Sequence, residues 1–409
     1  MDVNTVQNEG GRRTFPVGQL ILLMLSHAAA DFYGSFYDPI LPHIREQMHL
    51  TLMKSFMLAS VFRLTASFLQ PVIGYLVSEG KRRAILLLGI LLSMSMSLLG
   101  LAGAFAALLV VLFIGGLGVG TVHPCGAALA AAAERERKSL AISIYMIGGA
   151  IGAMGGPLIV PSLIERNPAS LAALALPGAA FVVLLAWRLS PSRKTHDDAH
   201  IRHHISFVNL FKRVAGVYLH VALRSVVIIL FGVLLPLHGT SRGLSLVAAG
   251  WVLAAFLLTG TISSLIGGYL TDRCPRKPFI VLTEFGAGIV LFSAPFFSGA
   301  AFYSLLLGGA SLAFAAMPLQ VVMAQERVPK GEGAASGFVM GFAHGTAALT
   351  LPLFGWLGDH WTETTGSEAI ATNRQLQLGA TAMLVAAVVA LFLKSHPGER
   401  KVEEQEGDS

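Results

Sequence analysis

Charged residues are scarce in this chain. Asp, Glu, Lys and Arg together make up 13% of its 409 residues, whereas hydrophobic residues make up 54%, and the mean hydropathy is +0.67. Soluble domains carry about 25% charged residues, so this composition excludes a water-soluble globular protein. We therefore expect an integral membrane protein, with the lipid bilayer as its first partner.

Cysteine is also nearly absent, since the chain has only Cys125 and Cys274. They lie in different kinds of segment, an apolar run and a polar loop, and so predict no disulfide framework. Two chemical motifs are missing as well: a Gly-rich phosphate loop ending in Lys and Ser or Thr, and the His-Glu-x-x-His pattern of zinc enzymes. We expect no cofactor, no metal, no ATP-driven step and no enzyme activity.

Apolar runs of membrane length, by contrast, fill most of the chain. A helix rises 1.5 Å per residue, so about 20 apolar residues cross the roughly 30 Å of bilayer hydrocarbon. Twelve runs meet this requirement, near residues 17–41, 52–78, 84–103, 105–131, 139–162, 169–189, 214–238, 246–270, 278–298, 301–323, 333–357 and 375–394. The expected fold class is an all-α integral membrane protein with twelve transmembrane helices.

A short pattern occurs twice in the chain, 194 residues apart. Gly-Tyr-Leu followed by a basic pair stands at 74–83 and returns at 268–277, and Pro124 maps onto Pro318 at the same offset. A parallel repeat of this size is typical of transporters built from two matched bundles. We expect a terminal segment 1–16, a six-helix bundle 17–189, a linker 190–213, a second six-helix bundle 214–394 and a tail 395–409.

The basic residues predict the orientation, because Lys and Arg in short loops stay on the cytoplasmic side. With the N-terminus inside, 22 of the 29 basic residues fall in inner segments and 5 in outer ones. The net charge of +6 therefore reflects topology and gives no reason to expect nucleic-acid binding. We expect a multi-pass protein of the inner (cytoplasmic) membrane with both termini in the cytoplasm.

The two remaining basic residues, Arg63 and Arg224, fall inside predicted spans. An arginine at this depth offers a fixed fork of donors to carboxylate or phosphonate oxygens, so both are candidates for binding an anionic substrate. Other polar residues in the spans extend the candidate set to His123, His344 and Gln320. The alternative for each is a structural hydrogen bond or ion pair, and for Glu284, on a predicted supporting helix, we prefer that structural role.

The first predicted helix carries three titratable residues on one stripe. His27, Asp31 and Asp38 follow one another at steps of four and seven residues. An ionised group in hydrocarbon is costly, so these side chains should face the bundle interior. A carboxylate beside an imidazole can take up a proton from one side and release it to the other, which predicts proton coupling, although a packing contact would use the same residues. The offset maps Asp31 onto Ser225, so we expect Asp31 and Arg224 to meet across a central cavity.

The repeated loops resemble the inner-loop signature of the major facilitator superfamily. Gly74, Arg82 and Arg83 carry it in the first half, and it returns in the second as Gly268, Asp272, Arg273 and Arg276. The resemblance implies the major facilitator fold, a gating role for these loops and a monomer that moves a small molecule.

A narrower resemblance is to the fosmidomycin-resistance group of drug exporters. It rests on His27 with Asp31, on His123-Pro124, and on a glycine run in the fifth helix: Gly148, Gly149, Gly152, Gly156 and Pro157. The glycine run is similar to an antiporter motif, although close helix packing selects the same residues. Two positions depart from the group, Cys125 in place of an acid and Arg63 in place of a neutral amide, and they favour a more anionic substrate.

Three functions follow from these observations. The leading hypothesis is a proton-coupled antiporter that exports a small anionic or amphipathic compound of the drug-efflux type, and the alternative is a proton symporter that imports a small organic anion. The third, an intramembrane metal enzyme, would use His27, Asp31, His123 and His344. We set it aside because these residues are scattered over three predicted helices without metal-ligand spacing.

Overall fold

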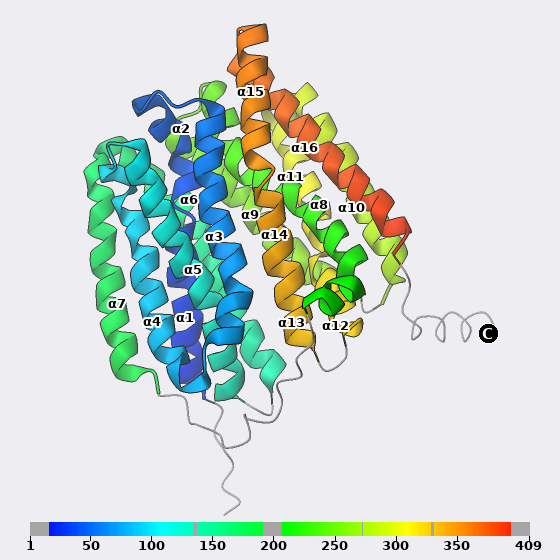
Figure 1. Ribbon diagram of the computed structural model, residues 1–409. Helices are drawn as coiled ribbons and strands as arrows, with labels where there is room; N and C mark the ends of the chain where they lie inside the picture. The colour runs from blue at the N-terminus through cyan, green and yellow to red at the C-terminus, as the bar shows by residue number, and fades with distance from the viewer. Residues whose placement is uncertain (1–15, 135–136, 191–206, 272, 329–330, 394–409) are drawn as a thin grey trace, which may run out of the picture.

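The computed structural model describes residues 16–134, 137–190, 207–271, 273–328 and 331–393, and within these ranges every regular element is a helix. The helices form two bundles that stand side by side (Figure 1). Most of the predicted segments 1–16 and 190–213, and the whole of 395–409, lie outside the described residues.

The first bundle contains six spans. Two of the spans also contain short 3-10 helices. Glu79–Lys81 precedes α4 and Met94–Leu101 follows it, and Pro168–Leu174 precedes α7. The bundle consists of α1 (Val17–Gly34) with α2 (Tyr37–Gln47), α3 (Leu52–Leu76), α4 (Arg82–Ser93), α5 (Phe105–Ala133), α6 (Lys138–Arg166) and α7 (Ala175–Arg188).

The second bundle also contains six spans, several of them broken. Its first helix begins at Phe207, before the predicted bundle boundary at residue 214. The bundle consists of α8 (Phe207–Ser241), α9 (Leu246–Thr271), α10 (Arg276–Ser293), α11 (Gly299–Ala315) with α12 (Met317–Glu326), α13 (Glu332–Gly337) with α14 (Ala343–Ala348) and α15 (Leu351–Thr365), and α16 (Glu368–Leu391).

Eleven helical segments of the described chain are long and apolar enough to cross a bilayer. They correspond to the second to twelfth predicted spans. The first predicted span, near 17–41, is divided in the structure between α1 and α2, and neither helix is among the eleven. Side chains such as Leu265 and Leu282, each 71% exposed, cover the outside of the bundles with apolar surface, as a protein embedded in lipid requires.

The internal repeat is visible in the packing of each bundle. A Cβ atom placed on Gly74 would lie 3.7 Å from the side chain of Pro124, and one placed on Gly268 would lie 3.6 Å from Pro318. These contacts join corresponding helices, α3 to α5 in the first bundle and α9 to α12 in the second. The predicted duplication is therefore a duplication of structure as well as of sequence.

Several helix pairs join the bundles: α3 packs on α14 and α15, α6 on α9, and α2 on α8 and α9. In Figure 1, α2 and the projecting end of α15 mark one end of the molecule, which we call the α15 end. The Gly74 and Gly268 motifs lie at the opposite end, which we call the motif end. A π-helix, Phe338–Phe342, interrupts the span between α13 and α14. Such segments often occur at functional sites, and this one ends two residues before His344.

Candidate functional site

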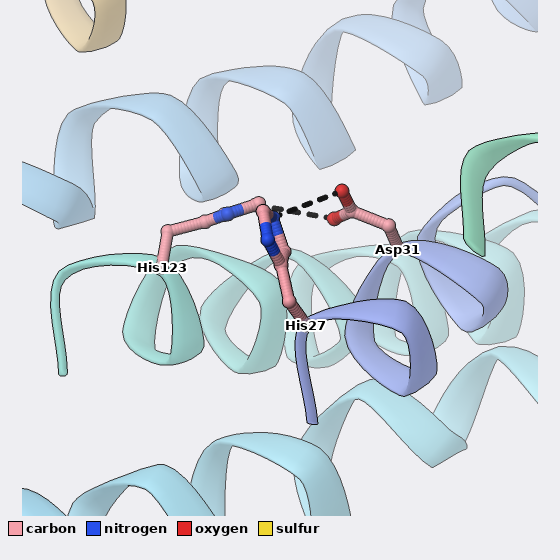
Figure 2. A group of neighbouring side chains, drawn as sticks. All are labelled: His27, Asp31 and His123. Atoms are coloured by element: carbon pink, nitrogen blue, oxygen red, sulfur yellow. Dashed lines mark ion pairs between the residues drawn. The ribbon is translucent and has the colours of Figure 1, made fainter. Parts of the chain in front are cut away.

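Three titratable side chains meet inside the first bundle. Asp31 of α1 lies between two imidazoles, with His27 Nε2 3.3 Å from Oδ2 and His123 Nε2 3.1 Å from Oδ1 (Figure 2). His27 is one turn before Asp31 on α1, whereas His123 comes from α5. Asp31 and His123 are 20% and 23% exposed and His27 is 3% exposed, so the carboxylate and one imidazole can still exchange protons with water.

The orientation of His27 is fixed by α6. Its Nδ1 lies 2.9 Å from the carbonyl oxygen of Tyr145, and since a carbonyl can only accept, Nδ1 carries the hydrogen. The other nitrogen, Nε2, then faces the Asp31 carboxylate and binds it well only when it is protonated too. The Tyr145 ring stacks on His27, with centroids 4.3 Å apart, and its hydroxyl donates to the carbonyl of Val122, 3.2 Å away on α5. Tyr145 thus ties together the three helices of the site.

A glycine of α6 leaves the space that this cluster occupies. A Cβ atom on Gly149 would lie 2.6 Å from the His27 ring and 2.8 Å from Asp31 Oδ2, closer than real Cβ contacts come. Any larger residue would therefore displace both side chains. The glycine run that the sequence singles out for packing thus also shapes the candidate site.

The other glycines of the run bring α6 against the backbone of α1. A Cβ atom on Gly148 would lie 1.9 Å from the carbonyl oxygen of Met24, and one on Gly152 would lie 2.2 Å from that of Ala28. Similar close contacts continue along α6, where Gly156 lies against Ser35 and the carbonyl of Pro157 lies against Gly250 of α9. The run therefore joins α6 to α1 within the bundle and to α9 across the bundle interface.

A second cluster lies inside the second bundle, around Arg224 of α8. This side chain is 1% exposed; its Nη1 donates to Gln320 Oε1 at 2.7 Å and its Nε to the Ala313 carbonyl at 3.0 Å. Its Nη2 is buried without a hydrogen-bond partner among the described residues. The prediction that Arg224 meets Asp31 was wrong, because each is bound within its own bundle.

Glu284 extends this second cluster. It accepts from Gln320 Nε2 at 2.9 Å and lies 2.7 Å from His220 Nε2, with both Glu284 and His220 fully buried. The sequence assigned Glu284 a structural role on a supporting helix and did not single out His220. The spacing in the sequence could have identified His220, since His220 and Arg224 are one helical turn apart and therefore share a face of α8.

Two further candidates bind each other. Arg63 of α3 donates to the carboxylate of Asp38 on α2, and the pair is 16% and 20% exposed. The pair lies next to Gly232 of α8, at the interface between the bundles. Because an opposite charge already matches Arg63, this side chain is less available to an anionic ligand than an unpaired arginine would be.

His344 completes the set of membrane candidates. It is half-buried on α14, and its Nδ1 lies 3.5 Å from the hydroxyl of Ser225, next to Arg224 in the chain. His344 therefore belongs with the second bundle's cluster and not with the other two histidines.

The motif residues form local contacts at the motif end. Arg82 binds Glu79 at 3.1 Å, and Arg83 donates to the carbonyl of Ala186. In the second copy Arg276 binds both carboxylate oxygens of Glu326, at 2.8 and 3.0 Å, while the Arg273 guanidinium lies over the Tyr269 ring, 3.7 Å from its centroid. Asp272 lies outside the described residues.

The structure corrects one argument from the sequence about metals. His27, Asp31 and His123 are not scattered, because their ligand atoms all lie within 4.8 Å of one another. The separation of 92 positions between Asp31 and His123 hid a contact that only the packing of α1 on α5 creates. The sequence reasoning was right to separate His344, but wrong to treat the other three as distant.

Comparisons with known proteins agree with this architecture. The sequence model of the Major Facilitator Superfamily matches residues 23–248 and 217–408, over both bundles. The fosmidomycin resistance protein of Escherichia coli (strain K12) is 29% identical over 371 residues, covering 84% of this chain and 87% of that protein. An uncharacterized MFS-type transporter of Bacillus subtilis (strain 168), YfnC, is 28% identical over 379 residues, covering 87% and 89%.

Solved structures share the fold at low sequence identity. An inward-facing bacterial homolog of the human lysosomal transporter Spinster superposes with a TM-score of 0.77 at 13% identity, covering 93% of this chain and 97% of that one. A D-xylose-proton symporter superposes with a TM-score of 0.68 at 17% identity, covering 90% and 97%. At these identities the likeness establishes the twin-bundle fold alone.

Proposed function

Because this chain belongs to the Major Facilitator Superfamily, whose members are membrane transporters and not enzymes, we propose that it is a proton-coupled antiporter that exports a small anionic or amphipathic compound. The observation that carries the proposal is the Asp31 carboxylate held between His27 and His123 in the first bundle. The name of the Escherichia coli relative favours export, since export of a drug produces resistance to it.

The proton step takes place at Asp31. The two imidazoles hold the carboxylate from either side, and a proton can move between Nε2 of either histidine and the carboxylate oxygens over 3.1 to 3.3 Å. Imidazole titrates in the physiological range, so loading and release need only a modest change in surroundings. Rocking of the two bundles supplies that change, because it alters which side of the membrane the cluster faces.

The substrate step takes place at Arg224. Its Nε donates to the Ala313 carbonyl and its Nη1 to Gln320, which leaves Nη2 to donate to an oxygen of an anionic substrate. Gln320, through its bond to Glu284, holds the guanidinium in place, and His344 adds a second polar group beside Ser225. A site at Arg224 and one at Asp31 would lie in opposite bundles, and rocking of the bundles would expose both to one side of the membrane at a time.

The topology completes the proposal. The basic residues of the motif end support a cytoplasmic position for that end, with the α15 end on the outer side of the cytoplasmic membrane. Asp38 and Arg63 then form an ion pair within the first bundle that faces Gly232 of the second bundle, at the interface along which the bundles move. The arginines of the two motifs control opening at the cytoplasmic end.

Asp31→Asn in proteoliposomes tests the proposal. With a pH gradient imposed across a series of pH values, wild-type protein should accumulate substrate against its gradient, and the variant should lose that accumulation. Gly18→Ala on the same helix, where a Cβ atom meets nothing within 4 Å, serves as the matched control. Gradient-driven transport by Asp31→Asn at the wild-type rate would contradict the proposal.

Two measurements address direction and substrate. Deleting the gene should raise the intracellular level of the compound if the protein exports it and lower it if the protein imports it, which separates antiport export from the symport alternative. A binding panel of phosphonates, organic acids and antibiotics, measured on wild-type protein and on Arg224→Lys, should show the largest loss of affinity for ligands with two anionic oxygens.

A further inference from the structure

Two carboxylates reach from one bundle to the other at the α15 end. Asp359 of α15 accepts hydrogen bonds from the backbone amides of Leu52, at 2.7 Å, and Met53, at 2.9 Å, at the start of α3. Glu165 of α6 accepts from the amides of Leu246, at 3.0 Å, and Val247, at 3.4 Å, at the start of α9. Each carboxylate thus caps a helix that belongs to the opposite bundle.

The two sets of bonds are copies of each other. The offset of 194 residues that relates the bundles maps Glu165 onto Asp359, and it maps the donors Leu52 and Met53 onto Leu246 and Val247. The acids differ in length, yet each binds the first two amides of a long helix. Equivalence at every position argues that the arrangement belongs to the duplicated fold and is not a chance surface contact.

The hydroxyl caps of the two helices repeat as well. Thr51 Oγ1 accepts from the amide of Lys54 at 3.2 Å, and Ser245 Oγ, at the equivalent position, accepts from the amide of Ala248 at 3.1 Å. The first amides of a helix have no partner within the helix itself. Each helix therefore satisfies one of these amides with its own hydroxyl residue, and a carboxylate from the other bundle satisfies two more.

Close packing brings the carboxylates within reach. A Cβ atom on Gly355, one turn before Asp359, would lie 2.6 Å from Met53 Cα, and one on Gly250 of α9 would lie 2.4 Å from the carbonyl oxygen of Pro157 on α6. The helices of both pairs therefore meet almost backbone to backbone beside each cap. A separation of the bundles at this end by even a few ångströms would break all four bonds.

We propose that Glu165 and Asp359 are the gating residues of the α15 end, two equivalent interbundle caps that hold it closed and are released together each time it opens. The inference extends the proposed function, because it assigns the step at which the transport route opens to the outer side. A negative charge is stabilised at a helix N-terminus by the aligned peptide dipoles, so each cap favours the closed state. On opening, water replaces the carboxylates at both helix ends, which keeps the step reversible.

The test measures the distance between the bundles directly. Spin labels are attached at Gly103→Cys and Ser298→Cys, both exposed and at the α15 end of the first and second bundle, in a Cys274→Ser background in lipid nanodiscs without substrate. The remaining cysteine, Cys125, is buried. Pulsed electron–electron double resonance then reports the distribution of distances between the two labels, and from it the ratio of closed to open molecules.

We expect a roughly three- to tenfold shift toward the open distance for Glu165→Ala and for Asp359→Ala, and about the product of the two shifts in the double variant. Glu363→Ala, at an exposed acid on α15, should leave the distances unchanged. If the double variant is not monodisperse, Glu165→Gln with Asp359→Asn keeps the shape and should shift the ratio less, in the same direction.

Unchanged distances in both double variants would overturn the proposal, as would a shift produced by only one of the two single alanine variants. The measurement needs neither a proton gradient nor a substrate. Failure of proton coupling at Asp31 would therefore leave its result unaffected, and the two proposals can fail separately.

Discussion

The two bundles share a scaffold but differ in the polar groups that they bury. Both pack a motif glycine against an equivalent proline, Gly74 on Pro124 and Gly268 on Pro318. In both, a polar residue near the middle of the first helix binds one from the fourth. The first bundle places a partly exposed carboxylate between one buried and one partly exposed imidazole, whereas the second buries Arg224 against Gln320 and the Ala313 carbonyl. The duplication kept the backbone contacts and let the buried chemistry diverge, and on this difference we base the proposal of proton exchange in one half and anion recognition in the other.

Removing the cation of the second bundle should have the largest effect. Arg224→Ala removes the arginine from a buried network that also contains Gln320 and Glu284, and breaking a buried charged network costs about 3 to 5 kcal/mol. We expect a marked loss of thermal stability, measured by tryptophan fluorescence in detergent. Arg224→Lys should retain much of the stability and lose substrate affinity, and equal stability of the alanine variant and wild type would contradict the network.

The first bundle should respond to a change that adds only one methyl group. Gly149→Ala pushes a Cβ atom into the space of His27 and Asp31, and overpacking of this kind costs about 1 to 3 kcal/mol. Transport should fall roughly tenfold or more, while the second bundle keeps its substrate affinity. Gly216→Ala in α8, whose Cβ atom would approach only the flexible end of Leu393, is the control, and normal transport by Gly149→Ala would show that the cluster tolerates displacement.

The two histidines of the first bundle should differ from each other. His27 is buried, stacked on Tyr145 and bonded to its carbonyl, so His27→Ala should lower both stability, by about 1 to 3 kcal/mol, and transport. His123 is more exposed, and His123→Asn should lower transport with little change in stability. Thermal unfolding and proteoliposome transport of both variants check this difference, which equal stability losses would refute.

The smallest effect should come from breaking the Arg45–Glu368 ion pair, which joins the bundles but has no equivalent at the 194-residue offset. Arg45 of α2 binds Glu368 of α16 at 2.6 Å on the partly exposed surface of the α15 end. Such pairs contribute about 0 to 1 kcal/mol, so Glu368→Ala should change transport less than twofold. A change as large as that of Gly149→Ala would mean that exposed charges, and not the buried clusters, dominate the cycle.

The sequence predicted the fold well because bilayer spans have a strong signal. Long apolar runs located the helices, and the repeated Gly-Tyr-Leu pattern revealed the two halves. The breaks in the second bundle were not foreseen, since the π-helix at Phe338–Phe342 has no distinctive composition. Pro318, which in the sequence served only as a mark of the repeat, lies at the boundary between α11 and α12, where a missing backbone donor interrupts the helix.

The sequence predicted candidate residues for the site but not their contacts. The cost of burying charge selected Asp31, Arg63 and Arg224 as candidates. Their partners depended on how α1, α5, α8 and α12 rotate and pack, which no local pattern encodes, so the pairing of Asp31 with Arg224 was wrong. The equivalence of Glu165 and Asp359 was present in the sequence at the 194-residue offset, but acids near predicted helix ends are common and gave no reason to look there.

A counterflow assay, which measures substrate exchange without a pH gradient, separates the proposed proton role of the first bundle from the proposed substrate role of the second. In proteoliposomes of Asp31→Asn loaded with substrate, exchange of internal for external labelled substrate should continue at close to the wild-type rate, while accumulation driven by a pH gradient disappears. This result would place the proton in the first bundle and leave substrate recognition to the second. Loss of both exchange and accumulation in a well-folded Asp31→Asn protein, or retention of both, would contradict the account.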